Sequence, residues 1–262
     1  DMRGMFADSG VYRIDLSSWQ PFSPTNMDSA FWHMENMTYA NISAADVSKV
    51  TDMTQIFGSN FALETVELGE FNTASLMYAE DMFLDCGELR ALDLSNMKMG
   101  KVKSMRRMVA HCSSLQTITI PDSVTTIADS AFSRCETLSA VQLSDSLQTI
   151  ASYAFSDCDA LKSVTLPNSL SSMGEAAFYR SGIQTLQLGT GLETIPKQAF
   201  SNCSDLKSIS FAEGLRTIDE QAFSYCTALQ KLVFPNSLQT IGANAFGSTE
   251  PNSIDYALRS IQ

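Results

Sequence analysis

The chain has 262 residues, 44% of them hydrophobic, and it carries a formal net charge of −12. A chain this apolar is not a disordered segment, and its acidity, without a basic patch, argues against nucleic acids and anionic membrane surfaces as partners. No apolar run approaches the roughly 20 residues that a membrane-spanning helix needs, so we expect no membrane insertion by this segment.

The first half of the chain repeats a unit of 25 or 26 residues. Phe31, Phe57, Phe83 and Val109 follow one another at intervals of 26, and Phe6 precedes Phe31 by 25. Twelve of the thirteen methionines lie before residue 110, and several of them fill the apolar columns of this unit. We therefore predict a methionine-rich repeat region over residues 1–121.

The second half repeats a shorter unit, close to AF-x-x-C-x-x-L-x-x-V-x-L-P-x-S-L-x-x-I. Its period is 22 or 23 residues, marked by Phe132, Phe155, Phe178, Phe200, Phe223 and Phe246. No Pro/Gly/Ser-rich or highly charged spacer separates the halves. We therefore predict that residues 122–262 continue the first region as one solenoid, in which each turn is stable only against its neighbours.

A short stretch with strand periodicity follows each phenylalanine-type position, because apolar residues alternate at its last positions. The ten stretches are VYRIDL (11–16), MTYANI (37–42), LETVEL (63–68), LRALDL (89–94), LQTITI (115–120), LSAVQL (138–143), LKSVTL (161–166), IQTLQL (183–188), LKSISF (206–211) and LQKLVF (229–234). Too few residues separate them for long helices. The pattern predicts an α/β fold, a leucine-rich-repeat solenoid with one parallel sheet on its concave face and short turns or helical turns on its convex side.

Two motif classes carry a family resemblance. Residues 122–246 resemble the BspA-like leucine-rich repeats of bacterial and some protozoan surface proteins, as in LPNSLQTIGANAF (234–246, with Phe234 for the first Leu). Residues 2–120 resemble the methionine-rich sister repeat of bacterial surface proteins, as in VTDMTQIF (50–57) and LDLSNM (92–97). The resemblance implies a secreted or surface-anchored protein that contacts host proteins, matrix or other cells, and it provides no catalytic residues.

All the cysteines occupy one column, three residues after the phenylalanine-type position: Cys86, Cys112, Cys135, Cys158, Cys203 and Cys226. We interpret them as small, buried thiols that fill the interior. Disulfides between neighbouring turns are the alternative, although side chains stacked in parallel rarely have the dihedral angle that a disulfide needs. A linear column does not converge on one ion, so zinc is disfavoured. We expect no metal and no cofactor.

His111 and Cys112, adjacent in MVAHCSSLQTI (108–118), look like a catalytic pair. His33 and His111 are 78 residues apart, however, and both lie two residues after the phenylalanine-type position, in a column of varied polar residues. We therefore expect both histidines to point outward, away from Cys112. The same column argument places Trp19 in the core and leaves Trp32 partly exposed.

Three carboxylates lie on the predicted concave face, at one position of their strands: Asp15, Glu67 and Asp93. Glu67 and Asp93 lie on neighbouring strands and could reach the roughly 5–10 Å separation of a glycosidase pair. Charges on a solenoid face more commonly serve solubility and contact, and no glycine loop suited to phosphate is present. We therefore expect no enzyme.

The outward strand positions form the candidate binding surface, and the first half is the more charged and varied. These positions hold Arg13, Asp15, Tyr39, Asn41, Thr65, Glu67, Asp93, Thr117, Thr119, Gln142, Thr165, Gln187 and Lys231. We hypothesise an extracellular or cell-surface binding or adhesion module, whose partner is a protein or glycan on a host or neighbouring cell. The partner contacts the first half, around Arg13, Tyr39, Glu67 and Asp93.

Two alternatives remain, a structural spacer in a larger surface protein and a glycan-acting enzyme that uses Glu67 and Asp93. The chain starts inside a turn, and IDYALRSIQ (254–262) only weakly resembles a strand unit. Stable arrays usually carry polar caps. We therefore expect a fragment of a longer array, or ends covered by a partner chain.

Overall fold

The computed structural model describes residues 1–19, 22–98, 100–102, 104–247 and 255–256. It divides into two compact units, Asp1–Val124 with Ala131–Leu138, and Thr125–Ser130 with Ser139–Gln262. Each unit is a parallel β-solenoid, in which a turn places its short strand beside that of the turn before. That the two repeat regions form one continuous solenoid stays a prediction.

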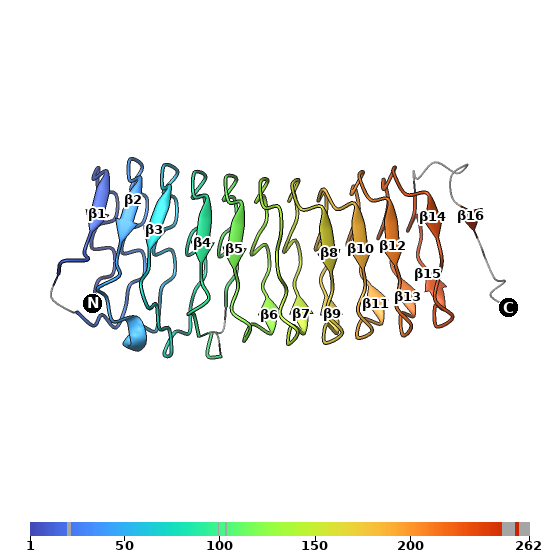
Figure 1. Cartoon of the computed structure of the whole chain (residues 1–262), viewed down its shortest axis with the longest axis horizontal. Coiled ribbons are helices and arrows are strands. Elements are labelled where there is room, and N and C mark those ends of the chain that lie inside the picture. The colour runs from blue at the N-terminus through green and yellow to red at the C-terminus, as the bar shows by residue number, and fades with distance from the viewer. Residues whose placement is uncertain (20–21, 99, 103, 248–254, 257–262) are drawn as a thin grey trace. The chain divides into compact units, whose positions relative to one another are not determined.

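In the first unit, the strands lie where the alternating stretches predict them (Figure 1). One parallel sheet contains β1 (Arg13–Asp15), β2 (Tyr39–Asn41) and β3 (Thr65–Glu67), and β4 (Ala91–Asp93) pairs with β5 (Thr117–Thr119). The register advances by one repeat per strand, which aligns Ile14, Ala40 and Val66. The central residue of each strand faces the interior, and most flanking residues face solvent.

The second unit has two rows of strands, which Figure 1 shows at different heights of the same turns. The first row contains β8 (Ser163–Thr165), β10 (Thr185–Gln187), β12 (Ser208–Ser210), β14 (Lys231–Leu232) and β16 (Asp255–Tyr256). The second contains β6 (Thr126–Ile127), β7 (Thr149–Ile150), β9 (Ser172–Met173), β11 (Thr194–Ile195), β13 (Thr217–Ile218) and β15 (Thr240–Ile241). The second row is not predicted by the sequence, because two residues are too few for alternation to be visible.

The predicted α/β class and the helical convex turns are wrong. Among the described residues the one helix is η1 (Val47–Lys49), a single 3-10 turn. Elsewhere the convex backbone runs through tight turns whose residues two before and two after the phenylalanine have positive φ angles, such as Ser29 and His33 around Phe31. A left-handed residue at every fourth position stops a right-handed helix from continuing.

The predicted strand LSAVQL (138–143) is likewise not a strand in the structure. The predicted strands before and after it, observed as β5 and β8, pair with β4 and with β10. A strand of two or three residues is defined by its partner, and side-chain alternation cannot show whether a partner lies alongside.

Hydrogen bonds between turns on the convex side share one direction. The amides of Ser29, Phe31 and His33 donate to carbonyls of the following turn, at 2.8–2.9 Å. In the second unit the amides of Tyr153 and Phe155 do the same, at 3.1 and 2.7 Å. The alternation of right- and left-handed residues turns these amides to the same side, so each turn bonds the next through its backbone.

Phenylalanine rings stack on one another in the interior of each unit. In the first, Phe31 and Phe57 have centroids 5.2 Å apart and nearly parallel planes, and Phe57 and Phe83 repeat this at 5.4 Å. In the second, Phe178 and Phe200 are 5.1 Å apart. These distances exceed the ~4.8 Å spacing of neighbouring strands, which gives the rings the offset that stacked aromatics prefer. All five rings are fully buried.

Two predictions concern the membrane and the carboxy-terminal segment. Within the described part of the chain, the structure contains no helix whose length and hydropathy would let it cross a bilayer. The segment IDYALRSIQ (254–262) lies outside the described residues except for Asp255 and Tyr256, which form β16 beside β14.

Candidate functional site

The outward face of β1–β3 carries a connected group of polar side chains. The guanidinium carbon of Arg13 lies 3.6 Å from the centroid of the Tyr39 ring on the next strand. Nη2 of Arg13 also donates to Oδ2 of Asp15, at 3.2 Å. A planar cation over an aromatic ring is an attractive contact, so Arg13 is held on two sides.

Asn41 extends this group across β2 to β3. Its Nδ2 donates to Oε2 of Glu67 at 2.8 Å and to the Tyr39 hydroxyl at 3.2 Å. Asn41, predicted to point outward from its strand, is only 6% exposed, because these two larger side chains cover it. Five of the predicted binding residues, Arg13, Asp15, Tyr39, Asn41 and Glu67, are therefore joined through direct contacts, and we call them the β1–β3 cluster.

In three strands, the side chain of the last residue also forms the turn that ends the strand. The backbone amide two positions later donates to the side chain of Asp15 at 3.1 Å, of Asn41 at 3.0 Å and of Asp93 at 2.9 Å. These are Asx turns, in which the side chain replaces a backbone acceptor. The hydroxyl and amide of Ser17, followed by Arg13, hold the pKa of Asp15 below its ordinary value. The carboxylates of Asp15 and Asp93 therefore shape the backbone as well as facing the solvent.

Glu67 departs from this pattern. Its side chain is one methylene longer, and the residue two positions later is Gly69, with φ +66°. A Cβ at that position would lie 2.9 Å from Ser43, so the turn accepts glycine only. Because glycine forms the turn, the carboxylate of Glu67 serves no turn of its own and is available to Asn41 and to the face.

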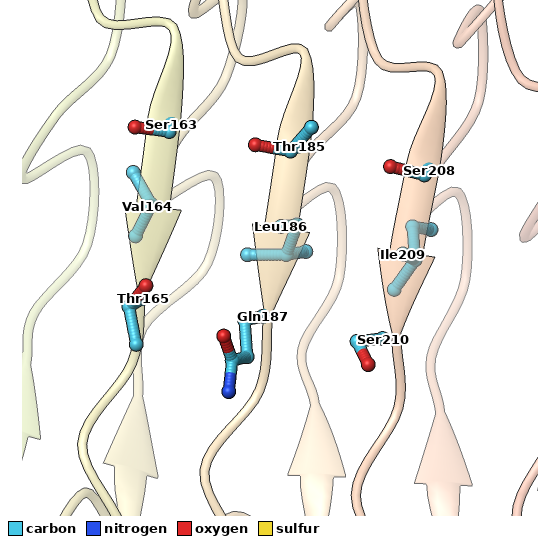
Figure 2. A pocket seen from close by; sticks show the side chains of 9 residues that line it. All are labelled: Ser163, Val164, Thr165, Thr185, Leu186, Gln187, Ser208, Ile209 and Ser210. Carbon is cyan, nitrogen blue, oxygen red and sulfur yellow. The ribbon is translucent and has the colours of Figure 1, made fainter.

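The second unit presents a different outward face, shown in Figure 2. Ser163 and Thr165 on β8, Thr185 and Gln187 on β10, and Ser208 and Ser210 on β12 line a shallow open depression of about 370 Å³. Val164, Leu186 and Ile209 lie between them as the central strand residues. These residues carry no charge, so this face offers neutral hydrogen-bonding groups only.

The other predicted binding residues do not join the β1–β3 cluster. Thr65 lies on β3, Asp93 on β4, Thr117 and Thr119 on β5, Thr165 on β8, Gln187 on β10 and Lys231 on β14, all exposed to solvent. Gln142 is exposed but lies outside any strand. No hydrogen bond or ring contact connects these side chains to one another within the described residues.

The cysteine column lies wholly inside the units. All six cysteines are 0% exposed and free of disulfides, which agrees with the interior interpretation. Most of their thiols donate to the carbonyl of the phenylalanine-type residue in the preceding turn: Cys86 to Phe57 and Cys112 to Phe83 at 3.1 Å, and Cys203 to Phe178 at 3.1 Å. The column therefore supplies a buried hydrogen-bond donor as well as volume.

Two turns without a cysteine show the same role. Nδ2 of Asn60 donates to the Phe31 carbonyl at 2.8 Å, and the Ser181 hydroxyl donates to the Phe155 carbonyl. Sequence reasoning missed this function, although the signal was present, because cysteine, asparagine and serine share a donor at small volume. Several of these carbonyls also accept a backbone amide of their own turn, as Phe83 does from Cys86 at 3.2 Å, so the column supplies a second donor to a buried acceptor.

Burial makes these thiols poor nucleophiles. It raises the pKa of Cys86, Cys135 and Cys203 to about 12, and it raises the pKa of Cys112 and Cys226 well above the ordinary value. Among the described residues, no group of three or more histidine, cysteine or acidic side chains is arranged to hold a metal ion.

Both histidines lie away from the cysteines. Nδ1 of His111 is 2.8 Å from Oδ1 of Asp85 in the preceding turn, and Nδ1 of His33 is 2.7 Å from Oδ1 of Asp8. Their side chains are 44% and 35% exposed, as the outward column predicts. The prediction for Trp19 is wrong: it is 46% exposed, with its ring edge-to-face on Phe22, because the loop after β1 departs from the column geometry of later turns.

Comparisons with known proteins agree with the repeat architecture. Residues 125–253 match the BspA type leucine rich repeat region, in six copies. Residues 1–122 match the family described as a Mycoplasma protein of unknown function, DUF285. Residues 125–253 belong to the BspA-type leucine-rich repeats.

Several solved structures are similar to this chain at low identity. A leucine-rich repeat protein from Bacteroides ovatus is 19% identical, with a TM-score of 0.48 over 83% of this chain and 78% of that one. A leucine rich cell surface protein from Faecalibacterium prausnitzii is 21% identical, with a TM-score of 0.39 over 87% and 79%. The leucine rich repeat protein of T. pallidum is 18% identical, with a TM-score of 0.45 over 79% and 71%. A search of the curated proteins found no match.

Proposed function

We propose that this chain is a binding or adhesion module exposed at a cell surface, and that it contacts a protein partner through the outward face of β1–β3. The observation that carries the proposal is the β1–β3 cluster, in which Arg13, Tyr39, Asn41 and Glu67 form a chain of contacts across three strands. Parallel strands of a solenoid hold such side chains at fixed spacing. A partner therefore meets groups that are already ordered, which reduces the entropy lost on binding.

The cell-surface location rests on the match of residues 125–253 to BspA-type repeats and on the resemblance of the motifs in both halves to repeats of bacterial surface proteins. Repeat solenoids commonly use the extended faces of their stacked turns for binding. A site is defined by its own residues rather than by its fold, so the test is directed at the β1–β3 cluster and the neighbouring Asp93.

The test is a charge reversal with a matched control. Beads coated with the whole chain are offered to immobilised matrix proteins and to cultured cells, and adhesion is counted. The E67R/D93R variant should lose adhesion to any surface that the unaltered chain binds. The E70R/E88R variant changes the net charge equally, at exposed positions outside the strands, and should keep it. Equal adhesion by E67R/D93R and the unaltered chain would reject this placement of the site.

The face of the second unit supports a different role for that part of the chain. Its residues on β8, β10 and β12 are small and uncharged, as expected of a spacer that carries another surface away from the cell. Removal of two whole turns from the second unit should then leave adhesion by the β1–β3 face intact. Loss of adhesion on that deletion, in a chain that remains folded, would assign binding to the second unit as well.

A further inference from the structure

The first part of the chain holds most of the negative charge. Residues 1–98 contain 15 acidic and five basic side chains, a net charge of −10 out of −12 for the whole chain. Four basic residues follow within positions 101–107 of the sequence, and Lys101, Arg106 and Arg107 lie outside the strands, in the connection between β4 and β5. Surface potential steers partners of opposite charge, so the charge of the outward strand face limits what can bind there.

The acidic groups of this face occupy the same position in three of the first four strands. Asp15, Glu67 and Asp93 each occupy the last position of their strand, on β1, β3 and β4. Arg13 is the one basic side chain in the described strands β1–β5. Because Arg13 is paired with Asp15, it leaves the charges of Glu67 and Asp93 uncompensated.

Each of these two carboxylates has one oxygen available to a partner. Oε2 of Glu67 accepts from Asn41, and Oδ1 of Asp93 accepts from the amide of Ser95. The remaining oxygens, Oε1 of Glu67 and Oδ2 of Asp93, accept no hydrogen bond from any described residue. Both side chains are exposed, and each is oriented by the bond that its other oxygen makes.

Arg13 shows which cation suits this surface. Its guanidinium lies flat over the ring of Tyr39 at 3.6 Å while it donates to a carboxylate at 3.2 Å. A planar guanidinium can stack and donate at the same time, whereas a lysine ammonium is a compact and strongly hydrated charge. The face thus already binds one arginine of its own chain, beside two carboxylates that bind none.

We propose that the outward face of β1–β4 binds a basic, arginine-bearing segment of a partner protein. The proposal rests on the function proposed above and adds the chemical class of the partner. Glu67 and Asp93 accept hydrogen bonds from guanidinium groups of the segment, next to the Arg13–Tyr39 stack. The neutral face of the second unit offers no such carboxylates and serves as the internal contrast.

Three labelled nine-residue peptides test the proposal: arginine alternating with serine, lysine alternating with serine, and glutamate alternating with serine. Fluorescence anisotropy is measured with the whole chain at low salt. The arginine peptide should bind more tightly than the lysine peptide, and the glutamate peptide should not bind. The E67Q/D93N variant should weaken arginine-peptide binding about tenfold, since each carboxylate contributes a charged hydrogen bond at a partly exposed interface. Added salt should weaken the binding of the unaltered chain.

The control is E70Q/E88Q, which removes the same charge at exposed positions outside the strands. This variant should bind the arginine peptide within about twofold of the unaltered chain, since neither side chain belongs to a strand of the outward face. Equal losses in the two variants, or equal binding of the arginine and lysine peptides, would overturn the proposal.

If the peptides fail to bind while E67R/D93R abolishes adhesion, the proposed function stands and the arginine partner is rejected. If the peptides bind as expected while adhesion survives E67R/D93R, the adhesion site is elsewhere.

Discussion

The two units share their interior and differ in their outward faces. Both have a column of stacked phenylalanines and a column of small donors to the carbonyls of those phenylalanines. On the outward side, β1–β3 carry charged and aromatic groups that contact one another, whereas β8, β10 and β12 carry separate serine, threonine and glutamine side chains. The interior of such a solenoid is thus fixed by packing, while the outward strand positions can change without a change of fold.

The largest expected effect on stability comes from removing one ring from the stack of each unit. F57A and F178A each replace a fully buried phenylalanine that is stacked on its neighbours. Each should lower the free energy of unfolding by about 3–5 kcal/mol, because burial is lost and a cavity remains. Urea unfolding, monitored by amide hydrogen exchange, shows which of the two units loses stability. A large loss for one variant and almost none for the other would show that the two interiors are not equivalent.

If the residues of the cysteine column act as hydrogen-bond donors, the stability of the chain depends on the donor group of the side chain and not only on its volume. C112A removes the side-chain donor to the carbonyl of Phe83, which still accepts the backbone amide of Cys86, and should cost about 0.5–1.5 kcal/mol in unfolding free energy. C112S keeps a donor and should cost less than C112A. In the second unit S181C should be tolerated and S181A should not, since Ser181 bonds the Phe155 carbonyl. If the alanine variants were as stable as the serine and cysteine variants, the donor role would be wrong.

The buried thiols also predict a loss of stability at high pH. The pKa of Cys86 is about 12 in the folded chain against an ordinary value of 9.0, so the unfolded chain ionises first as the pH rises. Stability from this thiol is complete below pH 9 and falls between pH 9 and 12, by about 1.4 kcal/mol at pH 10. The difference in unfolding free energy between the unaltered chain and C86S should therefore shift by that amount between pH 7.5 and 10. A pH-independent difference would mean that the thiol is not protected from ionisation.

The rate of thiol labelling is a second measure of how well the cysteines are buried. Cys112 should react slowly with a thiol reagent at pH 8 in the folded chain and rapidly after denaturation, because it is fully buried and its pKa is raised. Mass spectrometry of the labelled peptides measures this for the cysteines of both units together. Rapid labelling of Cys112 in the folded chain would reopen a chemical role for the His111–Cys112 pair.

The smallest expected effect on stability distinguishes the outward faces of the two units. N41A removes a side chain that is 6% exposed and bonded to Tyr39 and Glu67, so it should lower the unfolding free energy by about 1 kcal/mol. Q187A removes an exposed side chain of the second face, where such substitutions change stability by about 0.5 kcal/mol or less. Equal effects in thermal unfolding would mean that the β1–β3 cluster is no more ordered than the neutral face.

The sequence predicts the columns well, since each one repeats in every turn. Period and alternation identify the interior residues and nine of the ten strands, as at Ile14 and Leu186. Period and alternation do not predict a backbone conformation that leaves no repeating pattern in the side chains. The left-handed residues of the convex side, such as Ser29 and Tyr153, are serine, tyrosine and other ordinary residues rather than glycine, so nothing in the composition excludes a helical turn there.

The β1–β3 cluster illustrates a second limit. The sequence places Arg13, Tyr39 and Glu67 on one face, but it does not show that Arg13 stacks on Tyr39 or that Asn41 is covered by its neighbours. Nor does it separate Glu67 from Asp15 and Asp93, because all three carboxylates share one column. The difference emerges only from the Asx turns, where Asp15 and Asp93 bond the backbone and Gly69 replaces that bond after Glu67.

The one-way hydrogen bonds of the convex side have a consequence for how such a protein can vary. At Phe31 and Phe155 alike, the amide of one turn meets a carbonyl of the next, so every turn has a donating side and an accepting side. If a whole turn is inserted or removed, the turns on either side still meet donor to acceptor, and no peptide group in the arc loses its partner. The number of turns can therefore vary by integers at little energetic cost, whereas a partial turn leaves amides and carbonyls out of step.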